Sequence, residues 1–356
     1  MNAPNDIRTM LVESATRLMS DHVDQKMLDS AKREGWSPAL WQVLEQAELP
    51  RVSLPEDAGG AGGTLSDLAA VLRVAGRFAA PVPLAETAML SGWMLSASGL
   101  PLPRGALAAG PAGTEALTAR RDRRRWQISG ALKRMPWARI AHRLVVLAQS
   151  DDGPVVAAVD PTRCRIAPGH NLAGEPRDDV IFDAVTAEQV APAGAGVTRS
   201  TLRLRGALAR SVLMAGALEH ALALAVDYAR QRVQFGRKIG QFQAIQQELA
   251  RCAGESAAAV AAALSAAGVV ERGGDVTLAV ASAKIRTADA AREGALIAHQ
   301  VHGAIGVTDE YALHHATLRL WAWREEYGNE AEWAATLGGI IQKRGADAYW
   351  PAITTN

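Results

Sequence analysis

A basic corner in the second half of the chain combines residue types that can bind phosphate. Its cations are Arg230, Arg232, Arg237 and Lys238, and Phe235 lies among them. Guanidinium and ammonium groups bind phosphate oxygens through charge-assisted hydrogen bonds, and an aromatic ring stacks on planar groups. The corner therefore predicts a seat for a phosphate-bearing ligand with a stackable ring system. The alternative is a solvated basic surface, because runs of charge usually face water.

Two helical patterns flank this corner. Upstream, an apolar pattern over residues 212–225 predicts a helix that is buried on more than one side. Downstream, Phe242, Ile245 and Leu249 recur at three- and four-residue spacing, so a second helix is expected to begin after Gly240. The candidate ligand residues thus lie where two helices meet.

The same segment resembles a known family signature. The string R-x-x-F-G-x-x-I-x-x-F-Q, which begins at Arg232, is similar to the C-terminal-domain signature of the acyl-CoA dehydrogenase family of flavoproteins. The resemblance implies that Arg232, Phe235 and Gln243 contact the pyrophosphate and adenine of an FAD bound to a neighbouring subunit.

A second cofactor segment follows at residues 299–306. Its sequence, HQVHGAIG, resembles the family's Q-x-x-G-G-x-G loop, which implies that Gln300, Gly303 and Ala304 approach the cofactor of the adjacent subunit. Ala304 stands where a glycine is usual. The residues alone leave open a helix that simply ends at a glycine cap. FAD is the expected cofactor, and no metal site is expected, because the histidines here lack a further ligand at metal-binding spacing.

The order of patterns along the chain predicts three domains. Helical periodicity covers residues 1–105, short β-patterned runs separated by turn residues cover 106–199, and helical periodicity returns over 200–356. The clearest expected strands are residues 126–128, 144–148, 155–159 and 180–182.

Two stretches in the first domain strengthen the resemblance. Leu54-Pro-Glu-Asp-x-Gly-Gly and the run 76–83 are similar to pieces of the family's N-terminal helical domain, in the same order. The resemblance implies an α+β fold. It consists of an N-terminal α-helical domain, a small middle β-barrel or sandwich domain, and a C-terminal four-helix bundle that binds FAD and forms oligomers.

The resemblance also implies a reaction, the oxidation of an acyl-CoA thioester to its α,β-enoyl form. A carboxylate removes the α-proton while the β-hydride leaves to the flavin. The position of the family's usual catalytic glutamate falls on Tyr327 in this sequence, and Glu326, one residue earlier, is the candidate base. A shift of one residue turns a helical side chain by about 100°, so Glu326 could serve only if the local backbone differs from that of the family. The family's other glutamate position falls on Ala209, beside Arg210, and alanine cannot act as a base. We therefore predict Glu326 and Arg210 as the catalytic residues.

Other interpretations remain open at this stage. Glu325 and Glu326 could be solvated acids that pair with Arg319 or Arg324. The family's middle-domain segment that faces the flavin ring has no match here. The empty glutamate positions and this missing segment favour a non-catalytic partner subunit that completes a neighbour's FAD site. A flavin oxidase or monooxygenase on the same fold is a further alternative.

Length and composition set outer bounds. The chain has 356 residues and a formal net charge of +1, so no global charge favours nucleic acid or an anionic membrane. Cys164 and Cys252 stand alone, which argues against a disulfide framework and fits a reducing cytosol. The alanine-rich run 256–270 predicts a buried helix rather than a membrane span. A cytoplasmic oxidoreductase is expected, with an acyl-CoA substrate and an electron-transfer flavoprotein or similar acceptor, assembled as a homo- or heteromer of two or four subunits.

Overall fold

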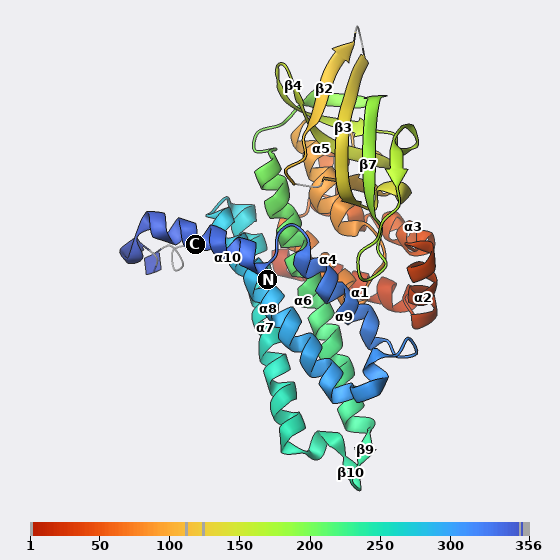
Figure 1. Ribbon diagram of the computed structural model, residues 1–356, viewed down its shortest axis with the longest axis vertical. Helices are drawn as coiled ribbons and strands as arrows, with labels where there is room; N and C mark the ends of the chain where they lie inside the picture. Colours follow the sequence, from red (N-terminus) through yellow and green to blue (C-terminus); the bar gives the residue numbers. More distant parts are fainter. Residues whose placement is uncertain (1–2, 111–112, 123–124, 349, 352–356) are drawn as a thin grey trace. The chain divides into compact units, whose positions relative to one another are not determined.

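The computed structural model describes residues 3–110, 113–122, 125–348 and 350–351. Helices fill its first and last parts, and strands lie between them (Figure 1). The chain divides into two compact units: residues 1–68 with 81–206, and residues 69–80 with 207–356. The N-terminal helices thus share a unit with the strands, and a short piece of the N-terminal region belongs to the helical C-terminal unit.

The N-terminal helices begin and end at the polar residues that the sequence offers. Asp24 accepts a hydrogen bond from the backbone of Met27, and Ser37 does the same for Leu40, with Pro38 at the first helical position. A π-helical stretch, Glu86–Gly92, runs directly into the last short helix. The helices are α1 (Ala3–His22), α2 (Gln25–Glu34), α3 (Pro38–Gln46), α4 (Leu65–Arg77) and α5 (Trp93–Ala97).

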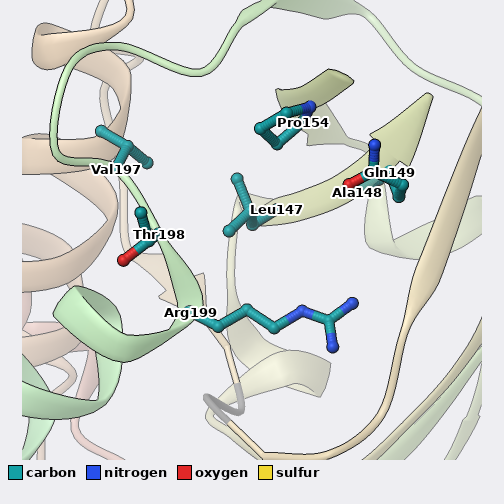
Figure 2. A pocket seen from close by; sticks show the side chains of 7 residues that line it. All are labelled: Leu147, Ala148, Gln149, Pro154, Val197, Thr198 and Arg199. Carbon is teal, nitrogen blue, oxygen red and sulfur yellow. The ribbon is translucent and has the colours of Figure 1, made fainter. Parts of the chain in front are cut away.

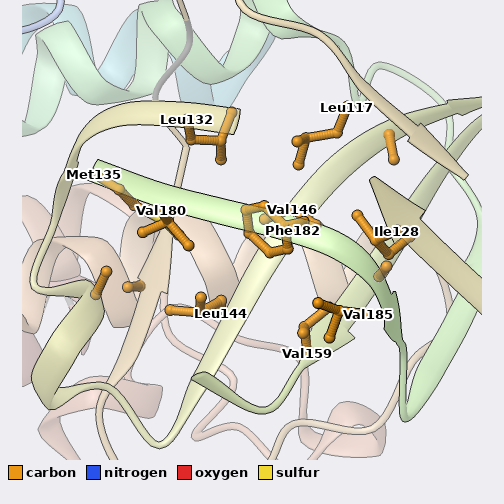
Figure 3. Close-up of a cluster of buried hydrophobic side chains, with 14 of the residues drawn as sticks. Leu117, Ile128, Leu132, Met135, Leu144, Val146, Val159, Val180, Phe182 and Val185 are labelled. Atoms are coloured by element: carbon orange, nitrogen blue, oxygen red, sulfur yellow. The ribbon is translucent and has the colours of Figure 1, made fainter. Parts of the chain in front are cut away.

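The middle of the chain forms an eight-stranded sheet in the order β6-β7-β3-β2-β4-β5-β8, with β1 paired to β4. Its apolar core includes Ile128, Val146 and Phe182, each at most 2% exposed (Figure 3). The four predicted strands are confirmed as parts of β3, β4, β5 and β7. The strands are β1 (Leu107–Ala109), β2 (Leu117–Asp122), β3 (Arg125–Pro136), β4 (Arg143–Ser150), β5 (Gly153–Val159), β6 (Arg165–Ala167), β7 (Arg177–Thr186) and β8 (Gln189–Pro192).

Long helices make up the C-terminal part. They are α6 (Arg199–Gln231), α7 (Gln243–Arg272), α8 (Val276–His302), α9 (Leu313–Glu325) and α10 (Glu330–Arg344). The helical N- and C-terminal parts with a sheet between them confirm the predicted α+β fold. The strands fall inside the predicted middle domain, 106–199, but the division into three domains stays a prediction.

Two glycines bring α4 and α6 to backbone contact. A Cβ atom on Gly76 would lie 2.1 Å from the Leu213 carbonyl oxygen, and one on Gly216 would lie 1.9 Å from the Arg73 carbonyl oxygen. No side chain fits at either position. Beside this contact Arg73 and Glu219 form an ion pair at 2.7 Å. The end of α4 therefore packs as part of the helical C-terminal unit.

Helix α7 buries only one of its faces within the chain. Cys252, Ser256, Ala259 and Ala263 are buried at three- and four-residue spacing, whereas Ala258 on another face is exposed. The prediction of a helix over residues 256–270 is thus confirmed, but only one face of this helix is buried within the chain. By length and composition alone, α6 and α7 also qualify as membrane spans, a test that core helices of soluble proteins pass equally.

Candidate functional site

The basic corner is built on a small β-hairpin. Strands β9 (Val233–Gln234) and β10 (Arg237–Lys238) pair antiparallel, and Phe235 and Gly236 form the turn with φ of 52° and 78°. Such a two-residue turn needs positive φ at both central positions, which glycine accepts readily. The strands were not predicted, whereas the second helix was expected after Gly240 and α7 does begin three residues later, at Gln243.

Aromatic rings and cations alternate on this hairpin. Phe235 is 90% exposed, and its ring centroid lies 6.1 Å from that of Phe242 at an interplanar angle of 88°. The guanidinium carbon of Arg237 lies 4.1 Å from the Phe242 ring centroid. These two arrangements are an edge-to-face pair and a cation–π contact. The corner therefore presents both a π surface and positive charge.

A cavity of about 540 Å³ opens beside the hairpin. Of the predicted cofactor residues, Arg232, Phe235, Gln300, Gly303 and Ala304 line it together. Gln243 is the exception: it occupies the first position of α7, outside the lining. The first turn of α7 has no side-chain cap, so its amide groups add positive potential next to the cavity. The structure thus brings together two segments that lie far apart in the sequence.

Three further aromatic side chains, which the sequence did not single out for this role, support the cavity. Tyr228 and His302 line it, with ring centroids 4.7 Å apart. His302 Nδ1 lies 2.7 Å from the Ala298 carbonyl oxygen, so it is the protonated nitrogen, and Nε2 accepts from the Tyr311 hydroxyl at 3.1 Å. Burial lowers the pKa of His302 and favours this neutral form. The only sequence signal was the position of His302 within the glycine-containing loop.

The charge of the corner is available to a ligand. Among the residues that the structure describes, no carboxylate lies within ion-pair distance of Arg230, Arg232, Arg237 or Lys238. A cluster of unpaired cations next to stacked rings suits a pyrophosphate joined to a planar ring system. The residues present therefore fit FAD.

The two predicted catalytic residues meet in a different place. Arg210, only 1% exposed, donates from Nε to Glu326 Oε2 at 2.6 Å. The Arg210 guanidinium carbon also lies 5.3 Å from the ring centroid of Tyr327. Glu326 follows the last residue of α9, so the ion pair fixes the turn between α9 and α10. Arg324 pairs with Glu330 instead, so the solvated-acid interpretation is wrong for Glu326.

A buried lysine completes this cluster. Lys284 on α8 is 0% exposed, and its ammonium group donates to the carbonyl oxygens of Trp323 at 2.8 Å and Arg324 at 2.9 Å. These carbonyls belong to the last turn of α9, where a helix leaves its acceptors unsatisfied and favours positive charge. No local pattern indicated this role, because Lys284 stands in an alanine-rich segment without an adjacent acidic residue. We call Arg210, Lys284, Glu326 and Tyr327 the buried charge cluster.

Because Lys284 is buried, we expect the free energy of unfolding to depend on pH. Burial lowers the pKa of Lys284 to about 7, with Glu326 opposing the shift, from an ordinary value of 10.5. Between these values the unfolded chain binds a proton that the folded chain lacks, so the free energy of unfolding rises with pH. Relative to Lys284→Met, the wild type should gain up to about 1.4 kcal/mol per pH unit between pH 7 and 9. Urea unfolding at both pH values measures this gain, and parallel pH profiles for the two proteins would contradict it.

Comparisons with known proteins identify the family of the chain. The family models for the acyl-CoA dehydrogenase N-terminal and C-terminal domains match residues 5–101 and 193–330. The chain is 30% identical over 319 residues to the acyl-CoA dehydrogenase IpdE2 of Mycobacterium tuberculosis, covering 87% of this chain and 90% of that one.

Solved structures show the same architecture. A variant of the Tcur3481–Tcur3483 steroid ACAD has a TM-score of 0.85 and 27% identity, covering 96% of this chain and 99% of its own. The ChsE4–ChsE5 complex of Mycobacterium tuberculosis has a TM-score of 0.86 and 22% identity, covering 97% and 99%. FAD is the cofactor, as the family and solved FAD complexes of this fold show. The chain therefore belongs to the acyl-CoA dehydrogenase family.

Proposed function

We propose that this chain is one subunit of a heteromeric acyl-CoA dehydrogenase, in which it helps to seat FAD while a homologous subunit supplies the catalytic base. The observation that carries the proposal is the ion pair between Glu326 and Arg210. Glu326 is the acid nearest the family's expected base position, and it is held at 2.6 Å by an arginine that is almost fully buried.

A general base must accept a proton and reach the reacting carbon. If Glu326 took up a proton, it would weaken the charge-assisted bond that it accepts from Arg210, a buried cation. Lys284, within the same cluster, adds a second positive group that favours the ionised carboxylate. Glu326 is therefore better suited to hold the α9–α10 turn than to exchange protons during turnover.

The corner residues have a positive role in this proposal. Arg232 and the first turn of α7 would bind the FAD pyrophosphate, and Phe235 and Phe242 would flank the adenine. Gln300 and Gly303 would contact the cofactor from the loop after α8. Bound FAD supplies the acceptor for the hydride that leaves the substrate's β-carbon.

The solved relatives support a heteromer and suggest a substrate class. Both are described by two gene products, Tcur3481–Tcur3483 and ChsE4–ChsE5, and the first is called a steroid ACAD. We extend to this chain a pairing with a homologous subunit and a substrate that joins CoA to a steroid-derived acyl group. An electron-transfer flavoprotein is the proposed electron acceptor.

The second candidate is a self-sufficient dehydrogenase with Glu326 as base and Arg210 as its orienting partner. One observation favours it: the Glu326 side chain keeps 13% of its surface exposed, so it is not sealed from a ligand. In this case removing the carboxylate should lower the rate about 10²–10⁴-fold. An oxidase or monooxygenase would reveal itself by oxygen consumption.

Turnover measurements with and without a partner distinguish the candidates. The purified chain alone is expected to be inert with acyl-CoA and an artificial electron acceptor. Co-expression with a homologue that carries a glutamate at the family position should produce activity. Within that complex, Glu326→Gln should change kcat per bound flavin only a few-fold, whereas replacing the partner's glutamate should abolish turnover. Rapid flavin bleaching by the chain alone would overturn the partner proposal.

The proposal also requires assembly, because the corner is expected to hold a neighbour's cofactor. The exposed small residues of α7, such as Ala257, Ala258 and Ala261, offer a face on which another helix can pack closely. We expect light scattering on the flavin-loaded protein to give the mass of a dimer or tetramer. A flavin-loaded monomer at micromolar concentration would contradict this expectation.

A further inference from the structure

A half-buried arginine in the first compact unit has no carboxylate partner among the described residues. Arg205 lies near the beginning of α6, and its Nε is buried without a hydrogen-bond partner among the described residues. Its guanidinium carbon lies 4.3 Å from the Trp93 ring centroid, and Nη1 makes one long contact of 3.5 Å with the Met89 carbonyl oxygen. Unlike Arg210, this arginine has no counter-ion within the part of the chain that the structure describes.

Arg205 faces a cavity of about 230 Å³. The walls combine apolar side chains, the Trp93 indole and two hydroxyl groups. The lining residues are Ser53, Leu54, Pro55, Leu65, Trp93, Ser96, Ala97 and Arg205. A mainly apolar cavity with a few converging polar groups is the usual form of a small-molecule site.

An anion bound in this cavity would offset the desolvation cost of the Arg205 guanidinium. Burial lowers the pKa of Arg205 to about 10, so the group stays charged at neutral pH. An unsatisfied buried donor carries a desolvation penalty, and a buried charge without a partner is costlier still. The stacking on Trp93 offsets part of this cost, but a cation–π contact leaves the Nε hydrogen without an acceptor.

We propose that this cavity binds an organic carboxylate, with the carboxylate on Arg205 and its short carbon chain against the apolar wall. A guanidinium binds carboxylates and phosphates alike, but this cavity holds one cation and no second positive side chain among its lining residues. The single positive charge of Arg205 would neutralise only half of the charge of a phosphate dianion, whereas it would neutralise a carboxylate fully. Ser53 and Ser96 can donate to its remaining lone pairs.

The carboxylate has two possible sources: a free acid, or the far end of the acyl group of a CoA thioester. The second source rests on the proposed function, and the first does not. Isothermal titration of the full, flavin-loaded protein with propionate, succinate and adipate tests the free acids. Titration with adipyl-CoA and hexanoyl-CoA, which differ in the terminal carboxylate, tests the thioester.

Arg205→Gln is the decisive variant, because it removes the charge and keeps a polar, unbranched side chain. Its affinity for the bound carboxylate should fall at least about tenfold, the loss expected for one charge-assisted hydrogen bond. Arg199→Gln is the matched control. Arg199 is an exposed arginine at the start of the same helix, beside a separate hollow with Leu147, Gln149 and Pro154 (Figure 2).

The outcomes separate the sources. A free acid that binds the wild type and Arg199→Gln but not Arg205→Gln supports the first source. Adipyl-CoA that binds at least tenfold tighter than hexanoyl-CoA, with this preference lost in Arg205→Gln, supports the second. Ser96→Leu, which fills the cavity and leaves Arg205 in place, should abolish the same binding, so the test survives if Arg205→Gln misfolds. Equal affinities across all these proteins, or no binding of any probe, would overturn the proposal whether or not the chain needs a catalytic partner.

Discussion

Glu326→Gln is expected to lower the free energy of unfolding by about 3–5 kcal/mol, the usual cost of breaking a buried ion pair from one side. The substitution removes the carboxylate that accepts from Arg210 Nε at 2.6 Å, and Arg210 is only 1% exposed. Lys284 lies in the same cluster with a pKa of about 7, so it carries part of a second positive charge at neutral pH. Lysine can lose its proton to relieve this repulsion, but arginine cannot. Urea unfolding at pH 7, followed by circular dichroism, measures the change.

Glu325→Gln is the control for this prediction. Glu325 is exposed and its carboxylate has only a 3.4 Å contact with the Asn329 side chain, so the substitution should change stability by no more than about 0.5 kcal/mol. The double variant Arg210→Met/Glu326→Gln should be more stable than Glu326→Gln alone, because it removes the buried arginine charge together with the carboxylate. A loss below about 1 kcal/mol for Glu326→Gln would show that the ion pair is not structural and would favour Glu326 as the base.

Arg232→Ala is expected to weaken FAD binding by about 10- to 100-fold. This range corresponds to the loss of a hydrogen bond from a charged donor, roughly 1.5–3 kcal/mol. Arg232 lines the cavity and has no carboxylate partner among the described residues. The Gln234 amide oxygen can accept from its Nη2 at 2.6 Å, but that acceptor is neutral, so a phosphate would be the stronger partner. The measurement is the dissociation constant of FAD for the assembled protein, obtained from flavin fluorescence.

Arg230→Ala is the matched control for the cofactor prediction. Arg230 stands two residues earlier, is exposed, and does not line the cavity, yet its replacement removes the same charge. Its effect on FAD affinity should be small and should vanish as salt is raised, because only long-range attraction is lost. If both variants retained wild-type flavin content, the corner would not be the pyrophosphate site.

Local features of the structure were predictable because their causes lie within a few residues. The cap at Ser37 and the turn at Phe235 depend on neighbouring backbone. Apolar runs revealed β4 and β5, which pair with each other over seven positions. Strand β2 was missed because its sequence, LTARRD, is mostly polar and exposed, and its strand conformation comes from pairing with β3 and β4.

The charged side chains were harder to predict because their partners are distant in the sequence. Arg210 and Glu326 are 116 positions apart, and Lys284 meets the end of α9 across about forty residues. The resemblance to the family suggested a catalytic role for Glu326, and no feature of the sequence suggested a role for Lys284. Arg205 likewise looked like one of several arginines in a helix, since only the folded unit shows that its Nε is buried without a partner.

The close backbone approach of α4 and α6 at Gly76 and Gly216 has a consequence for how the protein is made. The ribosome releases the end of α4 long before α6 exists, and the nearby ion pair of Arg73 with Glu219 joins residues 146 positions apart. The unit that contains the C-terminal helices also includes residues 69–80, which are synthesised before the strands. This segment can pack against α6 only after the strands have been synthesised. Such non-local closure slows folding and lengthens the time during which apolar helix faces stay uncovered. The C-terminal helices expressed from residue 207 onward would lack this segment, so they should not form the native unit on their own.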